Sequence, residues 1–256
     1  MALDQRRVQT AVIGDADSES PVVLPVEAIE VEEFRRLHTA DTYWCGLWLG
    51  GCGSQLSTKL YQDRACHFAH RPGPHTCRRR FSGVSSADHL FIKRSLLDWL
   101  TSQEIKAEAA ISRAEDGSRV GSDVVFEPQD RLALQVLLDT EAPARQGTLQ
   151  ILGPGVPHDP MELIRQGYIN RIKCIPDGTT RRVQVGTQRR NGTDWFDLHD
   201  VHLAPWGLST PAVEDLRREK AATHLIGAPR ATPKPTHAPT APVAGHVPWR
   251  GVVVVC

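Results

Sequence analysis

Residues 85–100 read SSADHLFIKRSLLDWL, and further along the chain come DVVFEP at 123–128 and LALQVLL at 132–138. Leucines recur at helical spacing in the first segment, and Ser85 or Ser86 is suited to cap it, so we expect a helix here. The two later segments are short and apolar, and turn residues separate them, which is typical of neighbouring antiparallel strands. A helix followed by strands predicts a mixed core of the α+β class.

Further elements are expected on both sides of this core. Strands are predicted at 107–112, 149–152, 169–175 and 181–185, and Asp177-Gly178 is a strong hairpin signal between the last two. Asp159-Pro160 and Thr210-Pro211 predict helices that begin there, the second running to about residue 223. Residues 227–256 are rich in Pro and Ala without an apolar period, so we expect a disordered tail.

The composition excludes several classes of protein. Of 256 residues, 40% are hydrophobic, which is enough to build a core and argues against collagen-like, mucin-like and wholly disordered chains. Thirty basic residues balance 30 acidic ones, so a uniformly positive surface is excluded, whereas a local basic groove is not. There is no apolar run of the roughly 18 residues that a membrane span needs, and no secretion signal. We therefore expect a cytoplasmic protein without a membrane partner.

Cysteine and histidine are concentrated in residues 45–77. In a reducing compartment such a cluster indicates a metal site rather than disulfides. Glycines at 50, 51 and 53 flank one of the cysteines, as in a zinc knuckle. The six candidate ligands are Cys45, Cys52, Cys66, His67, His70 and Cys77.

Structural zinc takes four nitrogen or sulfur ligands, so two of the six candidates must be spectators. We expect Cys45, Cys52, His67 and His70 to hold one Zn²⁺, with Cys66 and Cys77 in reserve. The alternative is that these side chains pack together without metal. A module of this kind would be held by coordination instead of a core.

Several of these segments together resemble one known family. Tyr43-Trp44-Cys45 through Cys52-Gly53, HFAH at 67–70, and SADHL at 86–90 with Lys93 are similar to the competence protein CoiA-like family, over roughly residues 43–140. Members look like nucleases with an N-terminal zinc-ribbon-like module and a restriction-endonuclease-like centre. The resemblance implies that Asp123 is the strand aspartate that holds Mg²⁺, with His89 and Lys93 near the scissile phosphate. Without the resemblance, that His-x-x-x-Lys pair is typical of a solvated helix face.

The chain departs from this family on the strand after Asp123. The family carries a Glu-x-Gln step there, whereas this chain has Gln135 in the position of the acid, or Ala133 if the frame is shifted. The second metal carboxylate is therefore missing, although Mg²⁺ sites depend on one or two carboxylates. We expect Gln135 to act as a polar positioning residue in place of a metal ligand. Four acids are close enough in sequence to substitute for the glutamate: Asp88, Glu127, Asp139 and Glu141.

The resemblance and the composition together divide the chain. We expect a lead-in segment at 1–42, with a short strand at 22–24 and a helical turn at 29–33. A zinc-ribbon-like Cys/His module at 43–82 and a restriction-endonuclease-like nuclease core at 83–155 follow. The rest is a C-terminal α+β region at 156–226 and the disordered tail at 227–256.

Basic residues are dense beside the candidate metal ligands. Residues 59–80 hold a single acid, Asp63, and six basic residues. The basic residues are Lys59, Arg64, Arg71, Arg78, Arg79 and Arg80. Such a run is either a solvated face or a surface that contacts phosphates without reading sequence. A second basic group lies at 181–182 and 189–190. Nearby Trp44, Trp48 and Tyr61 are suited to stack bases or to pack the module itself.

Three functions remain open from the sequence. The first is a Mg²⁺-dependent endonuclease that acts on single-stranded or branched DNA. The second is a degenerate nuclease fold, weak or inactive in catalysis, that binds DNA or a protein partner, with recombination or defence proteins as candidates. The third is a zinc-stapled interaction module whose basic run contacts protein or RNA.

Overall fold

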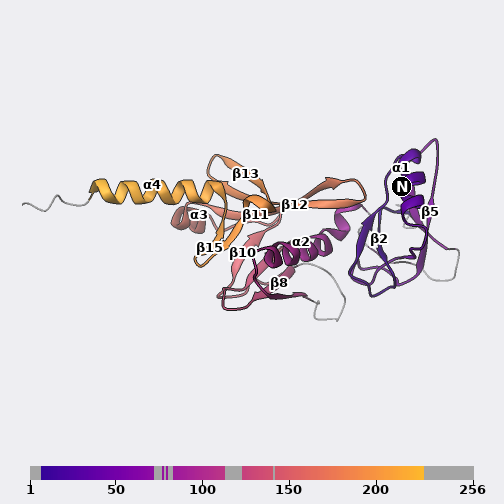
Figure 1. The fold of residues 1–256 in the computed structure, drawn as a ribbon, viewed down its shortest axis with the longest axis horizontal. Coiled ribbons are helices and arrows are strands. Elements are labelled where there is room, and N and C mark those ends of the chain that lie inside the picture. The colour runs from indigo at the N-terminus through magenta and orange to yellow at the C-terminus, as the bar shows by residue number, and fades with distance from the viewer. Residues whose placement is uncertain are drawn as a thin grey trace, which may run out of the picture. The chain divides into compact units, whose positions relative to one another are not determined.

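A computed structural model describes residues 7–71, 77, 79, 83–112, 123–140 and 142–227 (Figure 1). These residues form helices and several sheets, which confirms the mixed α+β class. Met1–Arg218 form one compact unit and Glu219–Cys256 a second, of which only the end of a helix is described. The predicted tail therefore lies outside the described residues from residue 228 onward. No helix in the described ranges is both long and apolar enough to cross a bilayer.

The first sheet has six strands, all antiparallel, in the order β1-β6-β5-β4-β2-β3. Its strands are β1 (Arg7–Val8), β2 (Thr10–Ile13), β3 (Pro21–Val23), β4 (Tyr43–Trp44), β5 (Gln55–Lys59) and β6 (His67–His70). Helix α1 (Ala28–Leu37) buries Val31 and Phe34, and the ring of Phe34 meets that of Phe68 edge-on at 6.3 Å. The segment expected as a lead-in thus supplies three strands of the sheet to which the Cys/His segment contributes the other three. It also supplies the helix α1, which packs with that sheet.

The Cys/His segment has a hydrophobic core, contrary to the expectation that coordination alone holds it. Val8, Leu24 and Phe34 from the N-terminal 42 residues pack with Leu56 and Phe68 in one buried cluster. The physical reason is that β4, β5 and β6 are short and would expose one face and both edges by themselves. The strands and helix of the preceding segment cover that face and pair with those edges.

The second sheet has seven strands in the order β13-β12-β11-β10-β9-β8-β7. Its strands are β7 (Ala107–Ile111), β8 (Asp123–Pro128), β9 (Leu134–Leu137), β10 (Leu149–Leu152), β11 (Ile169–Asp177), β12 (Thr180–Arg189) and β13 (Gly192–Asp197). Helix α2 (Asp88–Ser102) buries Leu90, Leu96 and Leu100 in the same cluster as Val124 and Phe126 of β8. Amphipathic periodicity in α2 and apolar strands together explain this packing.

The remaining elements precede α2, connect strands of the second sheet or follow that sheet. They are the 3₁₀ turns η1 (Val84–Ala87) and η2 (Leu198–Asp200), the helices α3 (Pro160–Gln166) and α4 (Pro211–Gly227), and the hairpin β14 (His202–Ala204) and β15 (Gly207–Ser209). Asp159 caps α3 by accepting a 2.8 Å hydrogen bond from the Met161 N–H, as its sequence predicts. Gly178, with φ +59°, forms the predicted turn between β11 and β12.

Two expectations about this region differ from the structure. The α-helix begins at Asp88, after η1, and its N-terminus has no side-chain cap from Ser85 or Ser86. Strand β10 is parallel to both β9 and β11, so one sheet runs across the expected boundary at residues 155 and 156. Parallel pairing needs a longer connection than a hairpin turn, and the local sequence pattern carries no signal for it.

Candidate metal centre

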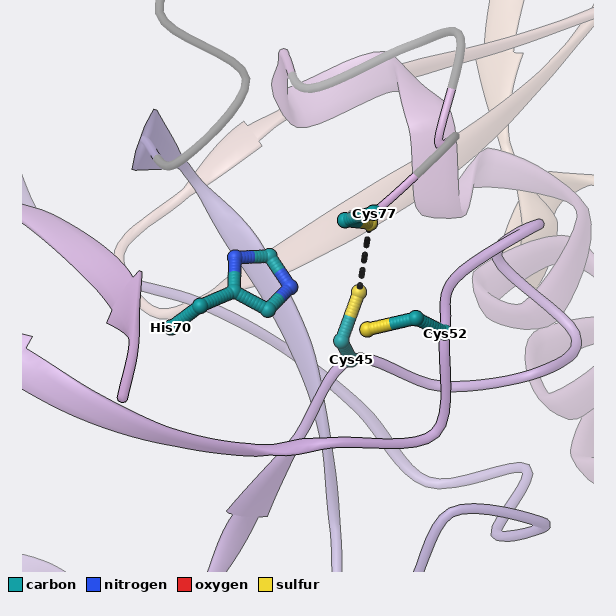
Figure 2. Close-up of side chains that lie close together, drawn as sticks. All are labelled: Cys45, Cys52, His70 and Cys77. Carbon is teal, nitrogen blue, oxygen red and sulfur yellow. Dashed lines mark hydrogen bonds between the residues drawn. The ribbon is translucent and has the colours of Figure 1, made fainter. Parts of the chain in front are cut away.

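Four side chains from three segments converge beside the first sheet. Cys45 and Cys52 lie in the loop between β4 and β5, His70 ends β6, and Cys77 lies ahead of η1. Their ligand atoms all lie within 4.8 Å of one another. Figure 2 shows the three sulfur atoms and the imidazole gathered around one point. These residues could therefore bind one metal ion such as zinc.

The distances and the donor types fit tetrahedral zinc. The Sγ atoms of Cys45 and Cys77 are 3.8 Å apart, along the dashed line in Figure 2. A tetrahedral site with Zn–S bonds of about 2.3 Å places its sulfur atoms about 3.8 Å from one another. Three cysteines and one histidine are also a donor set that structural zinc sites use.

The imidazole of His70 gives a second reason to expect a metal. Its Nδ1 and Nε2 atoms are both buried, and neither has a hydrogen-bond partner among the described residues. Burial of a polar atom without a partner costs about 1–3 kcal/mol. A cation bound to one of these nitrogens would relieve that cost, which a merely packed histidine would retain.

Glycines shape the loop that carries Cys45 and Cys52. Gly50 and Gly53 have φ values of +67° and +71°, in the left-handed region that side chains disfavour. A Cβ atom on Gly51 would overlap the carbonyl oxygen and the Sγ atom of Cys45. The Gly53 N–H donates a 2.9 Å hydrogen bond to the Cys45 carbonyl, which closes the loop. Glycine at 51 thus lets both cysteines approach one centre.

The three thiols differ in how readily they ionise in the metal-free chain. Burial raises the pKa of Cys45, and burial raises the pKa of Cys77 to about 12. Burial also opposes ionisation of Cys52, but hydrogen bonds with Ser54 and Cys77 outweigh it and lower the pKa to about 7. Because a metal binds the thiolate form, Cys45 and Cys77 must release protons when the centre is loaded near neutral pH.

Cys66 and His67 lie outside the group of four. The Cys66 Sγ atom accepts a 3.3 Å hydrogen bond from the Tyr61 N–H, and the ring of His67 stacks on the Tyr61 ring at 5.3 Å. His67 and His70 are three residues apart on β6, and an odd spacing places side chains on opposite faces of a strand. Cys77 therefore stands where the expected set had His67.

Asp123 and Gln135 meet on the neighbouring strands β8 and β9. The Gln135 Nε2 donates a 2.8 Å hydrogen bond to Asp123 Oδ2 and a 3.0 Å one to the Pro143 carbonyl. Gln135 Oε1 accepts a 2.7 Å bond from the Arg145 N–H. Both side chains are buried, and Asp123 Oδ1 has no hydrogen-bond partner within the described ranges.

His89 and Lys93 are bonded to two loops of the first sheet instead. His89 Nε2 donates a 2.8 Å hydrogen bond to the Trp48 carbonyl, and burial lowers the pKa of His89 to about 4. Lys93 Nζ forms a 2.5 Å ion pair with Glu19.

The two pairs of candidate catalytic residues also face different sides of the second sheet. Val124 and Phe126 of β8 pack in the same cluster as the buried residues of α2. Side chains alternate along a strand, so Asp123 faces the side away from α2, the helix that carries His89 and Lys93. The expected grouping of all four residues around one phosphate is therefore not present in this arrangement.

The acids considered as substitutes for the missing glutamate are placed as follows. Asp88 Oδ1 lies 2.6 Å from Arg181 Nε in a largely buried ion pair. Glu127 is exposed, and Asp139 Oδ1 accepts a 3.2 Å hydrogen bond from Thr140. Glu141 lies outside the described residues.

The basic residues near the metal centre fall into three groups. Arg64 and Arg71 are exposed, and the Arg64 guanidinium stacks 4.3 Å from the Tyr61 ring centroid. Arg79 is only 5% exposed and so is not part of an exposed basic face. Arg78 and Arg80 lie outside the described residues.

Three of the four arginines in the second basic group are paired with acids. Arg181 pairs with Asp88, Arg182 with Asp197, and Arg189 with Asp194. Its charges are therefore partly neutralised within the chain, which makes it a weaker candidate for phosphate contacts.

Comparison of the chain with family models, with curated proteins and with solved structures gave no match.

Proposed function

We propose that this protein binds single-stranded or branched DNA and that its nuclease-like centre does not cleave it. The observation that carries the proposal is the hydrogen bond from Gln135 Nε2 to Asp123 Oδ2. The amide occupies the place that the CoiA-like resemblance assigns to a second metal carboxylate, and it uses the remaining acid as its own acceptor. With an amide in that place, Asp123 is the one carboxylate left at the centre, whereas Mg²⁺ sites depend on one or two carboxylates.

The order of elements supports a restriction-endonuclease-like centre. Helix α2 is followed by the antiparallel strands β7, β8 and β9, with Asp123 at the head of β8. This is the order that the resemblance implies for such a core, with a zinc module ahead of it.

We further propose that the centre formed by Cys45, Cys52, His70 and Cys77 holds structural Zn²⁺. With four protein ligands the coordination sphere is closed, which is typical of structural rather than catalytic zinc. The ion would stabilise the loop between β4 and β5 against the end of β6. Elemental analysis of protein prepared with ample zinc should find about one zinc per chain, and its absence would contradict this assignment.

The DNA-contacting surface is proposed to include Arg64 and Arg71, with Lys59 beside them. All three are exposed: Lys59 ends β5, Arg64 lies between β5 and β6, and Arg71 follows β6. Exposed cations bind phosphates and release counterions, so binding should weaken as salt rises. Arginine stacked on a tyrosine also offers a flat surface for an unpaired base.

Fluorescence anisotropy with labelled single-stranded and branched DNA at low salt tests this function. We expect binding without Mg²⁺-dependent cleavage. The double variant Arg64→Gln/Arg71→Gln should bind more weakly, with the log–log salt slope reduced by about 2. Arg165→Gln/Arg218→Gln removes two exposed arginines outside both basic groups and should bind like wild type. Failure of wild type to bind any DNA at low salt would leave the zinc-stapled interaction module as the function.

A second candidate function is a Mg²⁺-dependent endonuclease. It is favoured by Asp123 Oδ1, which is buried and has no hydrogen-bond partner in the described part of the chain. An ion held there would supply Lewis-acid activation of the phosphate. Cleavage of labelled DNA in the presence of Mg²⁺, lost in Asp123→Ala, would establish this function in place of the non-cleaving one.

A further inference from the structure

Trp195 lies on the surface of the second sheet and outside its core. It belongs to β13 and pairs with Gly186 of β12, and directly paired residues share one face of a sheet. Val183 and Val185 of β12 pack in the cluster that contains α2, so Gly186 and Trp195 take the opposite face. Trp195 is partly exposed and belongs to none of the three hydrophobic clusters that the described residues form. The protein thus keeps a large aromatic ring at its surface.

Gly186 makes room for this ring. A Cβ atom at residue 186 would lie 2.9 Å from two carbon atoms of the indole and 2.7 Å from the methyl group of Thr193. Side-chain carbons do not normally approach so closely, so the indole lies against the bare backbone of β12. Glycine within a strand often marks such a close approach. The sheet therefore holds the ring in a defined place.

Lys173 of β11 places a cation on the same ring. Its Nζ atom lies 4.2 Å from the ring centroid, within the range of a cation–π contact. Ile172 packs in the cluster with α2, so Lys173 shares the face of Trp195. Lys173 is partly exposed and has a long flexible stem, so its ammonium can exchange the ring for a phosphate.

A basic hollow opens at the turn between β12 and β13. Its volume is about 380 Å³, and its lining residues are Gly167, Arg189, Arg190, Asn191, Gly192 and Asp194. Arg189 forms a 2.5 Å ion pair with Asp194, whereas Arg190 is exposed and forms no ion pair with the acids that the structure describes. The same hairpin thus offers an aromatic ring and, at its turn, a cation suited to a phosphate.

We infer that this part of the sheet binds an unpaired base of single-stranded DNA, stacked on Trp195, with Lys173 and Arg190 contacting phosphates. This inference rests on the proposed DNA binding and gives it a second contact surface. Asp123 also faces away from α2, so this surface and the nuclease-like centre share one face of the sheet. Stacking of a base on an aromatic ring is stronger than the cation–π contact of an exposed lysine, so the base displaces the ammonium.

Abasic DNA separates stacking from charge, because it keeps the phosphates and lacks the bases. Fluorescence anisotropy at low salt compares a thymidine oligonucleotide, the same strand with abasic sites, and duplex DNA, whose bases are already stacked. Trp195→Ala should lose about fivefold or more in affinity for the intact strand, the effect of one stacked base. It should bind the abasic strand and the duplex like wild type. Trp195→Phe keeps an aromatic ring and should retain most of the affinity.

Trp206→Ala is the matched control. Trp206 is 51% exposed and has the Arg217 guanidinium 4.1 Å from its ring centroid, but it lies in the turn between β14 and β15. This variant should bind the intact strand like wild type. A loss as large as that of Trp195→Ala would overturn the inference, because any surface tryptophan would then have the same effect.

The phosphate contact of Lys173 has its own measurement. Lys173→Gln should reduce the log–log salt slope by about 1, since one phosphate contact is lost. Lys106→Gln removes an exposed lysine directly before β7 and should leave the slope unchanged. An unchanged slope in Lys173→Gln would contradict the proposed contact.

Photocross-linking of the wild-type chain tests the surface without relying on any variant. A strand that carries 5-iodouracil should cross-link to Trp195, identified by mass spectrometry, because this base reacts with an aromatic ring stacked on it. Cross-links that all lie outside 171–197 would overturn the inference, as would a folded Trp195→Ala variant with wild-type affinity or an equal loss for intact and abasic strands. In these cases the proposed DNA binding would stand. Wild type that binds no DNA would overturn the proposed function and this inference with it.

Discussion

The amide of Gln135 donates a 2.8 Å hydrogen bond to the carboxylate of Asp123, and both side chains are almost fully buried between β9 and β8. Gln135 also bonds the Pro143 carbonyl and the Arg145 N–H, so one side chain ties an acid to the following loop. The amide therefore has a structural role that a carboxylate in its place could not fill. Under the proposed function, this hydrogen bond is the feature that keeps the centre from cleaving DNA.

Replacement of Gln135 by Glu tests that role. Glutamate would place negative oxygens against Asp123 Oδ2 and the Pro143 carbonyl, so we expect a loss of about 1–3 kcal/mol in the free energy of unfolding without metal. Mg²⁺ should recover part of the loss and increase any cleavage, because two carboxylates hold a divalent ion. Urea denaturation with and without Mg²⁺ measures the first effect, and cleavage of labelled DNA the second.

Gln129→Glu is the matched control for this change, because Gln129 is exposed. Its stability should stay within about 0.5 kcal/mol of wild type and should not respond to Mg²⁺. Brisk cleavage by wild type at ordinary Mg²⁺ concentrations would show that Gln135 does not silence the centre.

Zinc affinity should depend steeply on pH. Near neutral pH, binding must displace protons from Cys45 and Cys77, whose pKa values burial raises, to about 12 for Cys77. Two displaced protons give an increase of about 100-fold in affinity per pH unit. Below pH 7 the Cys52 thiol, with its pKa lowered to about 7, is protonated as well, so the slope should steepen. Chelator competition across this range measures the slope, and a flat profile would contradict thiolate ligation.

Gly51→Ala should weaken zinc binding although residue 51 is not a ligand. The new Cβ atom would overlap Cys45 O and Sγ, so the loop must shift and carry the cysteine away from the centre. We expect a loss of about tenfold or more in zinc affinity, measured by the same competition. Gly155→Ala is the control, because a Cβ atom there meets open space. Equal affinities for the two variants would show that the loop tolerates the shift.

His89 should make the stability of the protein sensitive to acid. Burial lowers the pKa of His89 to about 4 in the folded chain, from an ordinary value near 6.5. Between these values the unfolded chain binds a proton that the folded chain does not, so stability is full above about pH 6.5 and falls as the pH approaches 4. The contribution of this one group is about 3 kcal/mol.

Urea midpoints from pH 4 to 7 measure this dependence in wild type and two variants. His89→Gln keeps a donor for the Trp48 carbonyl but does not titrate, and its profile should be flatter by the stated amount. His67→Gln changes another buried histidine and should keep the wild-type slope. Identical slopes for wild type and His89→Gln would rule out His89 as the acid-sensitive group.

Local sequence signals determined several elements of the fold. The leucine spacing in 88–102, the Asp159-Pro160 cap and the Asp177-Gly178 turn each depend on residues within a few positions of one another, and the corresponding elements are present. The concentration of Cys and His at 45–77 likewise indicates the region of the metal centre, because metal ligands of these two types are recognisable from their density along the chain.

Only the tertiary structure decided which of those residues meet. The choice of Cys77 over His67 depends on the faces of β6 that His67 and His70 take and on where the fold places Cys77. The placement of Asp123 on the face of the sheet away from α2, and of Arg79 in a buried position between Thr10 and Ser86, depends on packing between distant segments. Ligand choice and burial arise from contacts between residues far apart in the chain, and the pattern of neighbouring residues carries no information about them.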